Sequence, residues 1–268
     1  MLHSMLGKRL RFGIAIIGTT ILGLAAMISP ARWPGRAQDQ TKPIYRPTGS
    51  EAFITGTISF AGKPSQPKKI DAGADPVCEK ASPDLFTEDV IVKAGKLANV
   101  FVYIRSGDTL EWYSFEAASP DVSIAHRGCQ LIPHVMGMQT RQVLKIANED
   151  ATTHNTNLDP KSNPFSNQSQ PPTAAPLEIK FKTPEVAIPV KDNQHPWERA
   201  YISVLSHPFF AVSALNGSYQ ISGLPPGQYT LVAWHEKFGE QSAEISVGVG
   251  EHKKLDFTFS TREDRQNQ

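Results

Sequence analysis

The chain has 268 residues and a formal net charge of +1, so it is long enough for one large or two small domains with their own cores. The near-neutral charge excludes the strong positive field that would indicate binding to nucleic acid or to an anionic membrane surface. Twenty-one prolines and nineteen glycines separate short apolar runs, which predicts many turns, few long helices and an all-β fold.

Residues 1–37 are predicted to be an export segment. Lys8, Arg9 and Arg11 form a basic region, and an apolar run follows over residues 12–28. The run is short for a bilayer-spanning helix, which needs about 20 residues, and no clear cleavage site follows it. A cleaved signal peptide and a membrane tether through residues 12–28 both stay open. Either one predicts that the rest of the chain lies outside the cytoplasm, in the periplasm, at the cell surface or secreted.

Cys78 and Cys129 are the only two cysteines in the sequence. In an oxidising compartment, an even pair within one domain predicts a single disulfide. Closing a loop of this length stabilises the fold by about 4 kcal/mol on the chain-entropy model. A disulfide here would leave no thiolate to ligate a metal.

The chain then alternates strands and turns. Residues 38–51 are polar and contain proline, which is typical of a linker. Residues 52–60 show an alternating pattern that is rich in β-branched residues and ends at a turn, as a strand does. Residues 99–104 have almost no polar face, which indicates a strand buried on both sides. Further strands are predicted at residues 89–93, 122–125, 142–147, 177–182, 186–190 and 201–205.

The part of the chain after residue 206 has shorter strands and more marked turns. Asn216-Gly217 lies between two apolar runs, and this dipeptide is the strongest short signal for a β-hairpin. A second turn is expected at residues 223–227. Residues 261–268 form a charged tail that is predicted to be disordered.

Two resemblances emerge from these motifs. Gly128-Cys129 to Val135, Ala147-Asn148 to His154-Asn155, and His195-Pro196-Trp197 to Tyr201 resemble the cupredoxin-like proteins of the plastocyanin and azurin superfamily, over about residues 123–205. Asn216-Gly217-Ser218-Tyr219, with residues 224–231, resembles the prealbumin-like module called the carboxypeptidase regulatory-like domain. The resemblances imply a cupredoxin-like Greek-key sandwich packed with a prealbumin-like β-sandwich module.

The expected boundaries follow from these resemblances. The cupredoxin-like domain is expected at residues 52–205 and the regulatory-like module at residues 206–260. Residues 52–60 also look like the first strand of the module. In that alternative the cupredoxin-like part is an insertion within the module.

The resemblance also implies a ligand set. In cupredoxins that hold blue copper, one histidine follows the asparagine-containing strand end, and His154 matches it. His195 matches the second histidine, whereas Asp192 replaces the cysteine and Glu198 replaces the methionine. Blue copper requires the soft thiolate, and a hard carboxylate in its place favours Cu(II). Efficient electron transfer is therefore not expected, but two histidines and two carboxylates remain a donor set for Cu(II) or Zn(II).

The leading hypothesis is an exported, non-catalytic binding or scaffold protein that contacts an unknown protein or glycan. Its metal site would be vestigial, with Asp192 and Glu198 solvated and with His154 and His195 at the rim. The alternatives are a Cu(II)- or Zn(II)-binding protein, a periplasmic copper electron-transfer protein, and a carbohydrate-binding module. The last would use an aromatic platform of Trp197, Trp234, Phe209 and Phe210.

The other histidines carry weaker signals. His134 and His235 are interpreted as structural residues at strand ends, and no spacing signal marks His126, His207 or His252. No catalytic triad, phosphate-binding glycine loop or paired-carboxylate motif stands out. The protein is therefore not expected to be an enzyme, and no cofactor is expected beyond a Cu(II) or Zn(II) ion.

Overall fold

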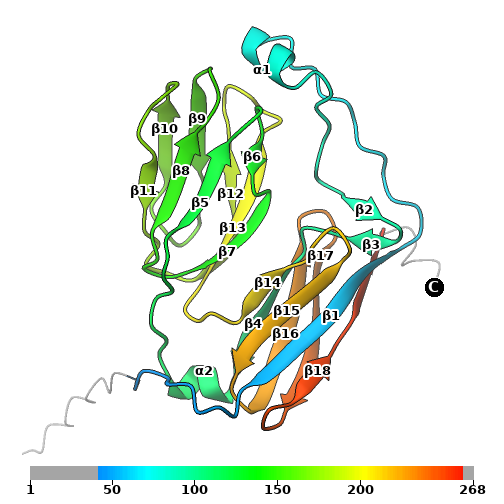
Figure 1. Ribbon diagram of the computed structural model, residues 1–268, viewed down its shortest axis with the longest axis vertical. Helices are drawn as coiled ribbons and strands as arrows, with labels where there is room; N and C mark the ends of the chain where they lie inside the picture. Colours follow the sequence, from blue (N-terminus) through cyan, green and yellow to red (C-terminus); the bar gives the residue numbers. More distant parts are fainter. Residues whose placement is uncertain (1–41, 262–268) are drawn as a thin grey trace, which may run out of the picture. The chain divides into compact units, whose positions relative to one another are not determined.

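The computed structural model describes residues 42–261. The predicted export segment, the start of the linker and the tail after residue 261 lie outside the described residues. Within the described part, nineteen strands and two short helices make up the regular structure (Figure 1). The predicted all-β fold class is confirmed. Within the same residues, no helix is both long and apolar enough to cross a bilayer.

The first sandwich is formed by the middle of the chain. Its two sheets have the strand orders β10-β9-β12-β13-β7 and β11-β8-β5-β6. The strands are β5 (Val122–His126), β6 (Leu131–Ile132), β7 (Val135–Gln139), β8 (Leu144–Asn148), β9 (His154–Leu158), β10 (Ser166–Gln170), β11 (Leu177–Ile179), β12 (Glu185–Lys191) and β13 (Arg199–Leu205).

The chain crosses repeatedly between these two sheets. β5 pairs in parallel with β8, and β7 pairs in parallel with β13, so the strands of these two pairs are joined by longer connections and not by hairpins. Ile124, Ile146 and Ile202, from three of these strands, lie in one buried core between the sheets. This two-sheet β-sandwich with crossing connections is the architecture that the cupredoxin-like resemblance implies.

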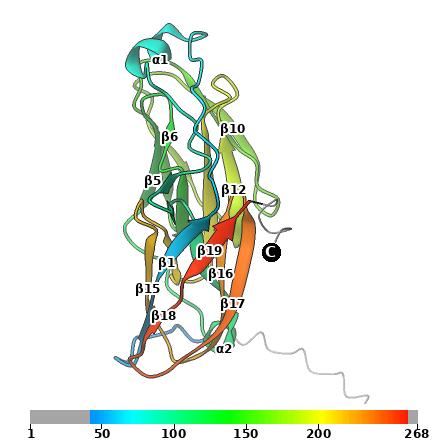
Figure 2. The same ribbon diagram turned by 90° about the vertical axis from the view of Figure 1, so that its right-hand side faces the viewer.

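The second sandwich combines strands from both ends of the described chain. β1 pairs with β15, β3, β18 and β19, and the other sheet has the order β14-β4-β16-β17; Figure 2 shows β1 alongside β19. The strands are β1 (Ala52–Ala61), β2 (Val92–Lys93), β3 (Lys96–Leu97), β4 (Phe101–Gly107), β14 (Phe210–Val212), β15 (Ser218–Leu224), β16 (Gly227–His235), β17 (Gly239–Val247), β18 (His252–Lys254) and β19 (Phe257–Ser260).

The division of the chain differs from the expected boundary at residue 205. β1 and β4 pair with strands of the C-terminal module, so the first sandwich lies between β4 and β14 in the sequence, as an insertion. β4 is buried on both faces because it packs against both sandwiches. Val102 and Ile104 belong to the core of the second sandwich, whereas Phe101 and Tyr103 pack in a cluster with Val135 and Leu205 of the first sandwich.

The long connection between β1 and β2 carries the helix α1 (Pro76–Ala81), and α2 (Asp108–Trp112) follows β4. Asp75 is the N-cap of α1, because its side chain accepts hydrogen bonds from the backbone N–H groups of Val77 and Cys78. Cys78 forms a disulfide with Cys129, which confirms the predicted pairing. The disulfide fixes α1 beside the loop that follows β5.

Candidate metal centre

Five polar side chains gather where strands of the first sandwich begin and end. His126 is the last residue of β5, and His154 is the first residue of β9. Asp192 follows β12 directly, whereas His195 and Glu198 lie in the loop that leads to β13. The hydrogen bonds from the Asn155 and His195 backbone N–H groups to Asp192, at 3.0 Å each, hold this loop against β9.

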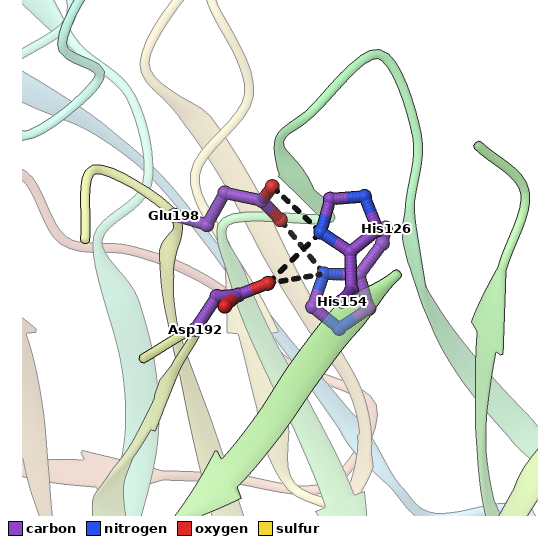
Figure 3. A group of neighbouring side chains, drawn as sticks. All are labelled: His126, His154, Asp192 and Glu198. Carbon is purple, nitrogen blue, oxygen red and sulfur yellow. Dashed lines mark hydrogen bonds and ion pairs between the residues drawn. The ribbon is translucent and has the colours of Figure 1, made fainter. Parts of the chain in front are cut away.

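The histidines direct their Nδ1 atoms at the two carboxylates (Figure 3). His126 Nδ1 lies 2.7 Å from Glu198 Oε2. His154 Nδ1 lies 2.9 Å from Asp192 Oδ2 and 3.1 Å from Glu198 Oε1. His195 Nδ1 lies 3.1 Å from the same Asp192 oxygen.

The distances between these donor atoms are close to those found around one shared metal ion. Donor atoms bound to one ion at about 2.0 to 2.2 Å lie no more than roughly 4.4 Å apart. One donor atom from each of His126, His154, Asp192 and Glu198 falls within a group 4.8 Å across. The structure therefore contains a His/Asp/Glu group able to hold a metal ion, with His195 at its edge.

All five side chains are buried. The exposed fractions are 2% for Asp192, 1% for Glu198 and 3% for His195, and both His126 and His154 are fully buried. The expectation of solvated carboxylates and of histidines at a rim is therefore wrong. Because burying an ionised carboxylate is costly unless a partner compensates it, the charge of these two carboxylates has to be offset by the neighbouring imidazoles or by a cation.

The outward-facing nitrogen of each histidine has its own acceptor. His154 Nε2 lies 3.2 Å from Asp150 Oδ2, and His195 Nε2 lies 3.1 Å from Asp75 Oδ2. His126 Nε2 lies 2.9 Å from the hydroxyl oxygen of Thr156. Such outer partners are the usual means of fixing the orientation and tautomer of metal-binding histidines.

The tautomer of neutral His126 follows from a chain of hydrogen bonds. The Gln170 amide nitrogen donates to the Ile146 carbonyl, so the amide oxygen of Gln170 accepts the Thr156 hydroxyl proton at 2.7 Å. A hydroxyl has one proton to donate, so Thr156 Oγ1 accepts the Nε2–H of His126. Nδ1 of neutral His126 is therefore a bare lone pair that faces Glu198.

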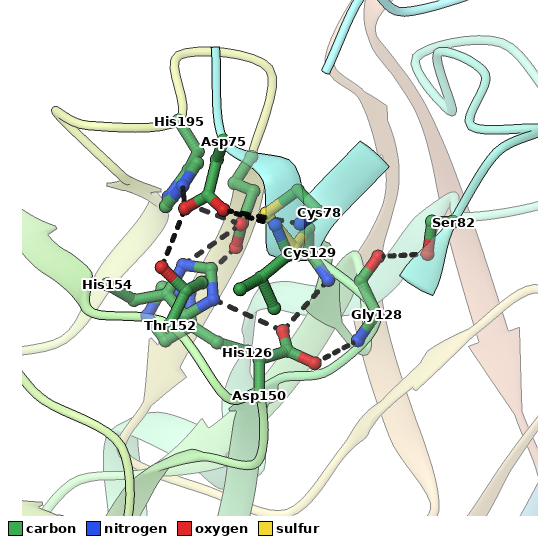
Figure 4. The surroundings of a disulfide bond; sticks show 12 residues. Asp75, Cys78, Ser82, His126, Gly128, Cys129, Asp150, Thr152, His154 and His195 are labelled. Atoms are coloured by element: carbon green, nitrogen blue, oxygen red, sulfur yellow. Dashed lines mark hydrogen bonds and ion pairs between the residues drawn. A yellow bond between two sulfur atoms is a disulfide. The ribbon is translucent and has the colours of Figure 1, made fainter. Parts of the chain in front are cut away.

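The outer carboxylates are themselves held in place near the disulfide (Figure 4). Asp150 accepts the backbone N–H groups of Gly128 and Cys129 at 2.7 and 2.8 Å. Asp75 accepts the Thr152 hydroxyl at 2.6 Å. This hydrogen bond, together with those from His195 and the α1 backbone, lowers the pKa of Asp75 to about 2. Both carboxylates are thus ionised acceptors for the imidazole N–H groups.

The two inner carboxylates differ in their own partners. Asp192 Oδ1 accepts the Gln194 and His195 backbone N–H groups at 2.6 and 3.0 Å. Burial opposes ionisation of Asp192, but its hydrogen bonds outweigh burial and lower its pKa. Glu198 receives no backbone N–H, and its Oε1 is a buried atom without a hydrogen-bond partner. Such an orphaned oxygen, near the imidazole of His154, is what a bound cation would satisfy.

A proton can replace the cation in the metal-free protein. Burial disfavours the imidazolium form of His154, but hydrogen bonds to Asp150 and Asp192 and the negative charge of Glu198 outweigh burial and raise the pKa of His154 to about 11. The site therefore attracts positive charge at its centre. Because metal binding requires neutral imidazole, an ion has to displace this proton.

Sequence reasoning missed His126, Asp75 and Asp150. His126 and Asp75 are separated from the recognised loop by a long stretch of chain, whereas Asp150 lies four residues before His154 but was not singled out. One signal was available for His126, because it directly follows the strand predicted at residues 122–125. Its relevance depends on the parallel pairing of β5 with β8, which places His126 beside the strand that leads toward His154.

The other singled-out residues lie elsewhere. His134 pairs with Glu236, and His235 is buried and accepts the Lys237 backbone N–H. The four aromatic residues considered as a sugar platform pack against different partners: Trp197 against His195, Trp234 against Tyr201, Phe209 against Phe115 and Phe210 against Phe101. The prediction of a protein or glycan partner stays a prediction.

A known protein family matches the part of the chain that forms most of the second sandwich. The model of the carboxypeptidase regulatory-like domain family matches residues 187–260, which confirms that predicted resemblance. The match covers β14 to β19 and begins within β12 of the first sandwich. No curated protein matches the sequence.

Several solved structures are similar to part of the chain. A purple cupredoxin from Nitrosopumilus maritimus is 17% identical, with 31% of this chain and 99% of that chain covered and a TM-score of 0.28. Amicyanin from Paracoccus versutus is 12% identical, with 38% and 96% covered and a TM-score of 0.29. A Cu-containing nitrite reductase from Thermus scotoductus is 15% identical, with 39% and 28% covered and a TM-score of 0.29.

Proposed function

We propose that this protein is an exported, non-catalytic metal-binding protein. Its cupredoxin-like sandwich would hold one divalent ion, Cu(II) or Zn(II), through His126, His154, Asp192 and Glu198, with His195 as a fifth donor. The observation that carries this proposal is the position of Glu198. Its buried Oε1 has no hydrogen-bond partner and lies 3.1 Å from His154 Nδ1.

The charge of the cluster supports a cation. Asp75, Asp150, Asp192 and Glu198 surround the three imidazoles, and no lysine or arginine forms an ion pair with any of the four within the described chain. The outer two carboxylates are satisfied by backbone, hydroxyl and imidazole donors. The inner two face imidazole nitrogens, so a divalent ion would balance their charge and accept electron pairs from both kinds of donor.

The donor set does not fit a blue copper centre. Both cysteine sulfurs are bound in the disulfide, so no thiolate is left to supply the covalency that rapid cycling between Cu(I) and Cu(II) requires. Imidazole nitrogen and carboxylate oxygen suit Cu(II) and Zn(II) instead. A Cu(II) form would therefore lack the intense visible band of a copper–thiolate bond.

We propose that the site is not catalytic, because its protein donors leave no open coordination position. Catalytic zinc sites retain an open coordination position for water or substrate. Here four or five protein donors surround the centre, and Asp75 at the start of α1 covers His195 from outside. The disulfide supports an extracytoplasmic location, because such bonds persist in oxidising compartments.

Metal analysis of protein purified without chelator tests the proposal. We expect one equivalent of Cu(II) or Zn(II), or uptake of one equivalent from micromolar solution by metal-free protein. A His126→Ala, His154→Ala double variant should lose the binding, whereas His252→Ala, at an exposed histidine, should retain it. Circular dichroism would verify that both variants are folded. Folded wild-type protein that takes up neither ion would refute the proposal.

In the Cu(II) form, electron paramagnetic resonance tests the role of His126 directly. Three imidazole nitrogens should couple to the copper in the wild type and two in His126→Ala. An unchanged nitrogen pattern would show that His126 is not a ligand.

A further inference from the structure

A cavity of about 260 Å³ lies beside the metal loop and is lined in part by Glu198, but by none of the three histidines of the metal centre. Its walls come from four segments: the connection before β2, the turn before β7, the loop after β12, and the turn after β16. Residues that matter for its chemistry are Phe86, Glu88, His134, Trp197, Glu236 and Lys237. Both sandwiches therefore contribute to it, and small-molecule sites often occur at such junctions.

Most charges in the cavity are already paired. Lys237 Nζ lies 2.9 Å from Asp89 Oδ2, and the His134 ring is hydrogen-bonded to Glu236. The His134 and Glu236 side chains are 9% and 7% exposed, so this pair forms a fixed polar wall. The Arg199 side chain is exposed, and its Nε contacts the Pro196 carbonyl at 3.4 Å.

Glu88 is the exception among the carboxylates that line the cavity. Within residues 42–261, its carboxylate has no hydrogen bond and no ion pair, although the residue is half-buried and lines the cavity. Burial raises the pKa of Glu88, and the nearby His134 opposes this only in part. A partly desolvated carboxylate without a partner is favourable only where a cationic group can approach it.

The apolar surface of the cavity fits the rest of such a ligand. Phe86 is 42% exposed, although it is a large apolar residue, and Trp197 is half-buried. Trp197 is fixed by the hydrogen bond from its indole N–H to the Cys129 carbonyl at 3.0 Å. Aromatic faces attract organic cations as well as apolar groups. The volume lies just below the usual range of about 300 to 1,000 Å³ for ligand sites, so only a small ligand fits.

We propose that this cavity binds a small organic ammonium ion, with Glu88 as its counter-charge and with Phe86 and Trp197 against its apolar body. The site goes beyond the proposed metal binding and does not depend on it. Its ligand would touch the outer side of the loop that carries Glu198, and none of the histidine nitrogens of the metal centre.

Three probes of similar size and different charge test the inference. They are 2-phenylethylammonium, 2-phenylethanol and phenylacetate, titrated into the full chain and followed by calorimetry and ligand-observed NMR. We expect the cation to bind at least about tenfold more tightly than the neutral alcohol, as a charged hydrogen bond contributes. Phenylacetate should not bind. Equal binding of the three probes, or no binding of the cation up to millimolar concentration, would overturn the inference.

Two matched variants locate the site. Glu88→Gln keeps the size of the side chain and should weaken binding of the cation by about tenfold. Glu178→Gln makes the same change at an exposed position on β11 and should leave binding unchanged. Phe86→Ser should weaken all probes that bind. Thermal unfolding would verify that each variant is folded, and unchanged binding to folded Glu88→Gln would refute the assignment.

The experiment separates this site from the metal centre. Titrations with metal-loaded and with chelator-treated protein should give the same preference for the cation. A protein that takes up no metal but binds the cation through Glu88 would refute the proposed function and support this inference. A protein that takes up the metal but does not bind the cation would support the proposed function and refute this inference.

Discussion

At the scale of single residues, the hydroxyl of Thr156 determines which nitrogen of His126 faces the metal centre. Thr156 donates to Gln170 and accepts from His126 Nε2. Because Gln170 is anchored on the Ile146 carbonyl of β8, the orientation of a ligand on β5 depends on two neighbouring strands. The imidazole is thereby oriented before any ion arrives, which favours binding.

Replacing Thr156 by valine keeps the shape of the side chain and removes both hydrogen bonds. We expect the affinity for Zn(II) or Cu(II) to fall by about 10- to 100-fold, as the loss of an outer partner does in other metal sites. Thr156→Ser should restore most of the affinity, because it restores the hydroxyl. Competition with a coloured chelator measures both. If the serine and valine variants bind equally weakly, packing rather than the hydrogen bond is responsible.

The sequence revealed part of the centre at this scale. His154, Asp192, His195 and Glu198 follow from the cupredoxin-like spacing of one loop and one strand end, and the structure places the four together. His126 could not be found in the same way, because its contribution depends on which strands are neighbours. The burial of Asp192 and Glu198 was also invisible, since carboxylates in a loop are usually solvated.

At the scale of elements, the disulfide connects α1 to the metal centre. Asp75 at the N-cap of α1 contacts His195, and the Cys129 backbone N–H contacts Asp150, which in turn contacts His154. The two ends of the bond thus support two different histidines. We therefore expect the disulfide to affect the proposed metal binding as well as stability.

A Cys78→Ser, Cys129→Ser variant tests this connection. We expect weaker metal binding, by about tenfold, because α1 is no longer tied in the position that lets Asp75 orient His195. Metal-free protein should also lose up to about 4 kcal/mol of unfolding free energy, measured with urea. Asp75→Asn, with the disulfide intact, should weaken metal binding with a smaller loss of stability. Unchanged affinity in the serine variant would contradict the connection.

The hairpin turn before β15 provides a second test at this scale. Gly217 has a φ of +74°, and a Cβ there would lie 2.4 Å from the Ile58 carbonyl oxygen of β1. Gly223 has a φ of +75° with no atom within 4 Å of such a Cβ. Both Gly→Ala substitutions cost about 1 kcal/mol or more through the backbone conformation. Gly217→Ala should be the more destabilising in urea unfolding, because only it forces β1 and the turn apart.

At the scale of the whole molecule, a two-sheet sandwich is inserted into another one. The alternating pattern of β1 and the Asn-Gly turn predicted strands correctly, since both are local signals. The assembly of β1 with β15, β18 and β19 could not be predicted with the same certainty. The strands that pair with β1 lie far away in the sequence, and the burial pattern of a strand does not show which other strands pair with it.

The second sandwich also carries two buried histidines that should make stability depend on pH in mild acid. Burial lowers the pKa of His207 to about 4 and that of His235 to about 4, whereas unfolded histidine titrates near 6.5. Between these values the unfolded chain binds more protons than the folded protein, so stability rises with pH and falls on acidification. Complete titration of each residue would cost about 3 kcal/mol.

We therefore expect the unfolding free energy to decrease steadily from pH 6.5 to pH 4 in chelator-treated protein. Below about pH 5.5 His154 should add little slope, because its folded-state pKa of about 11 and the unfolded value near 6.5 leave it protonated in both states there. His207→Gln and His235→Gln should each flatten the dependence, and His252→Gln, at an exposed position, should not. Urea unfolding at several pH values measures the slope. A slope that persists in the first two variants would mean that other groups, such as the carboxylates of the metal centre, govern acid stability.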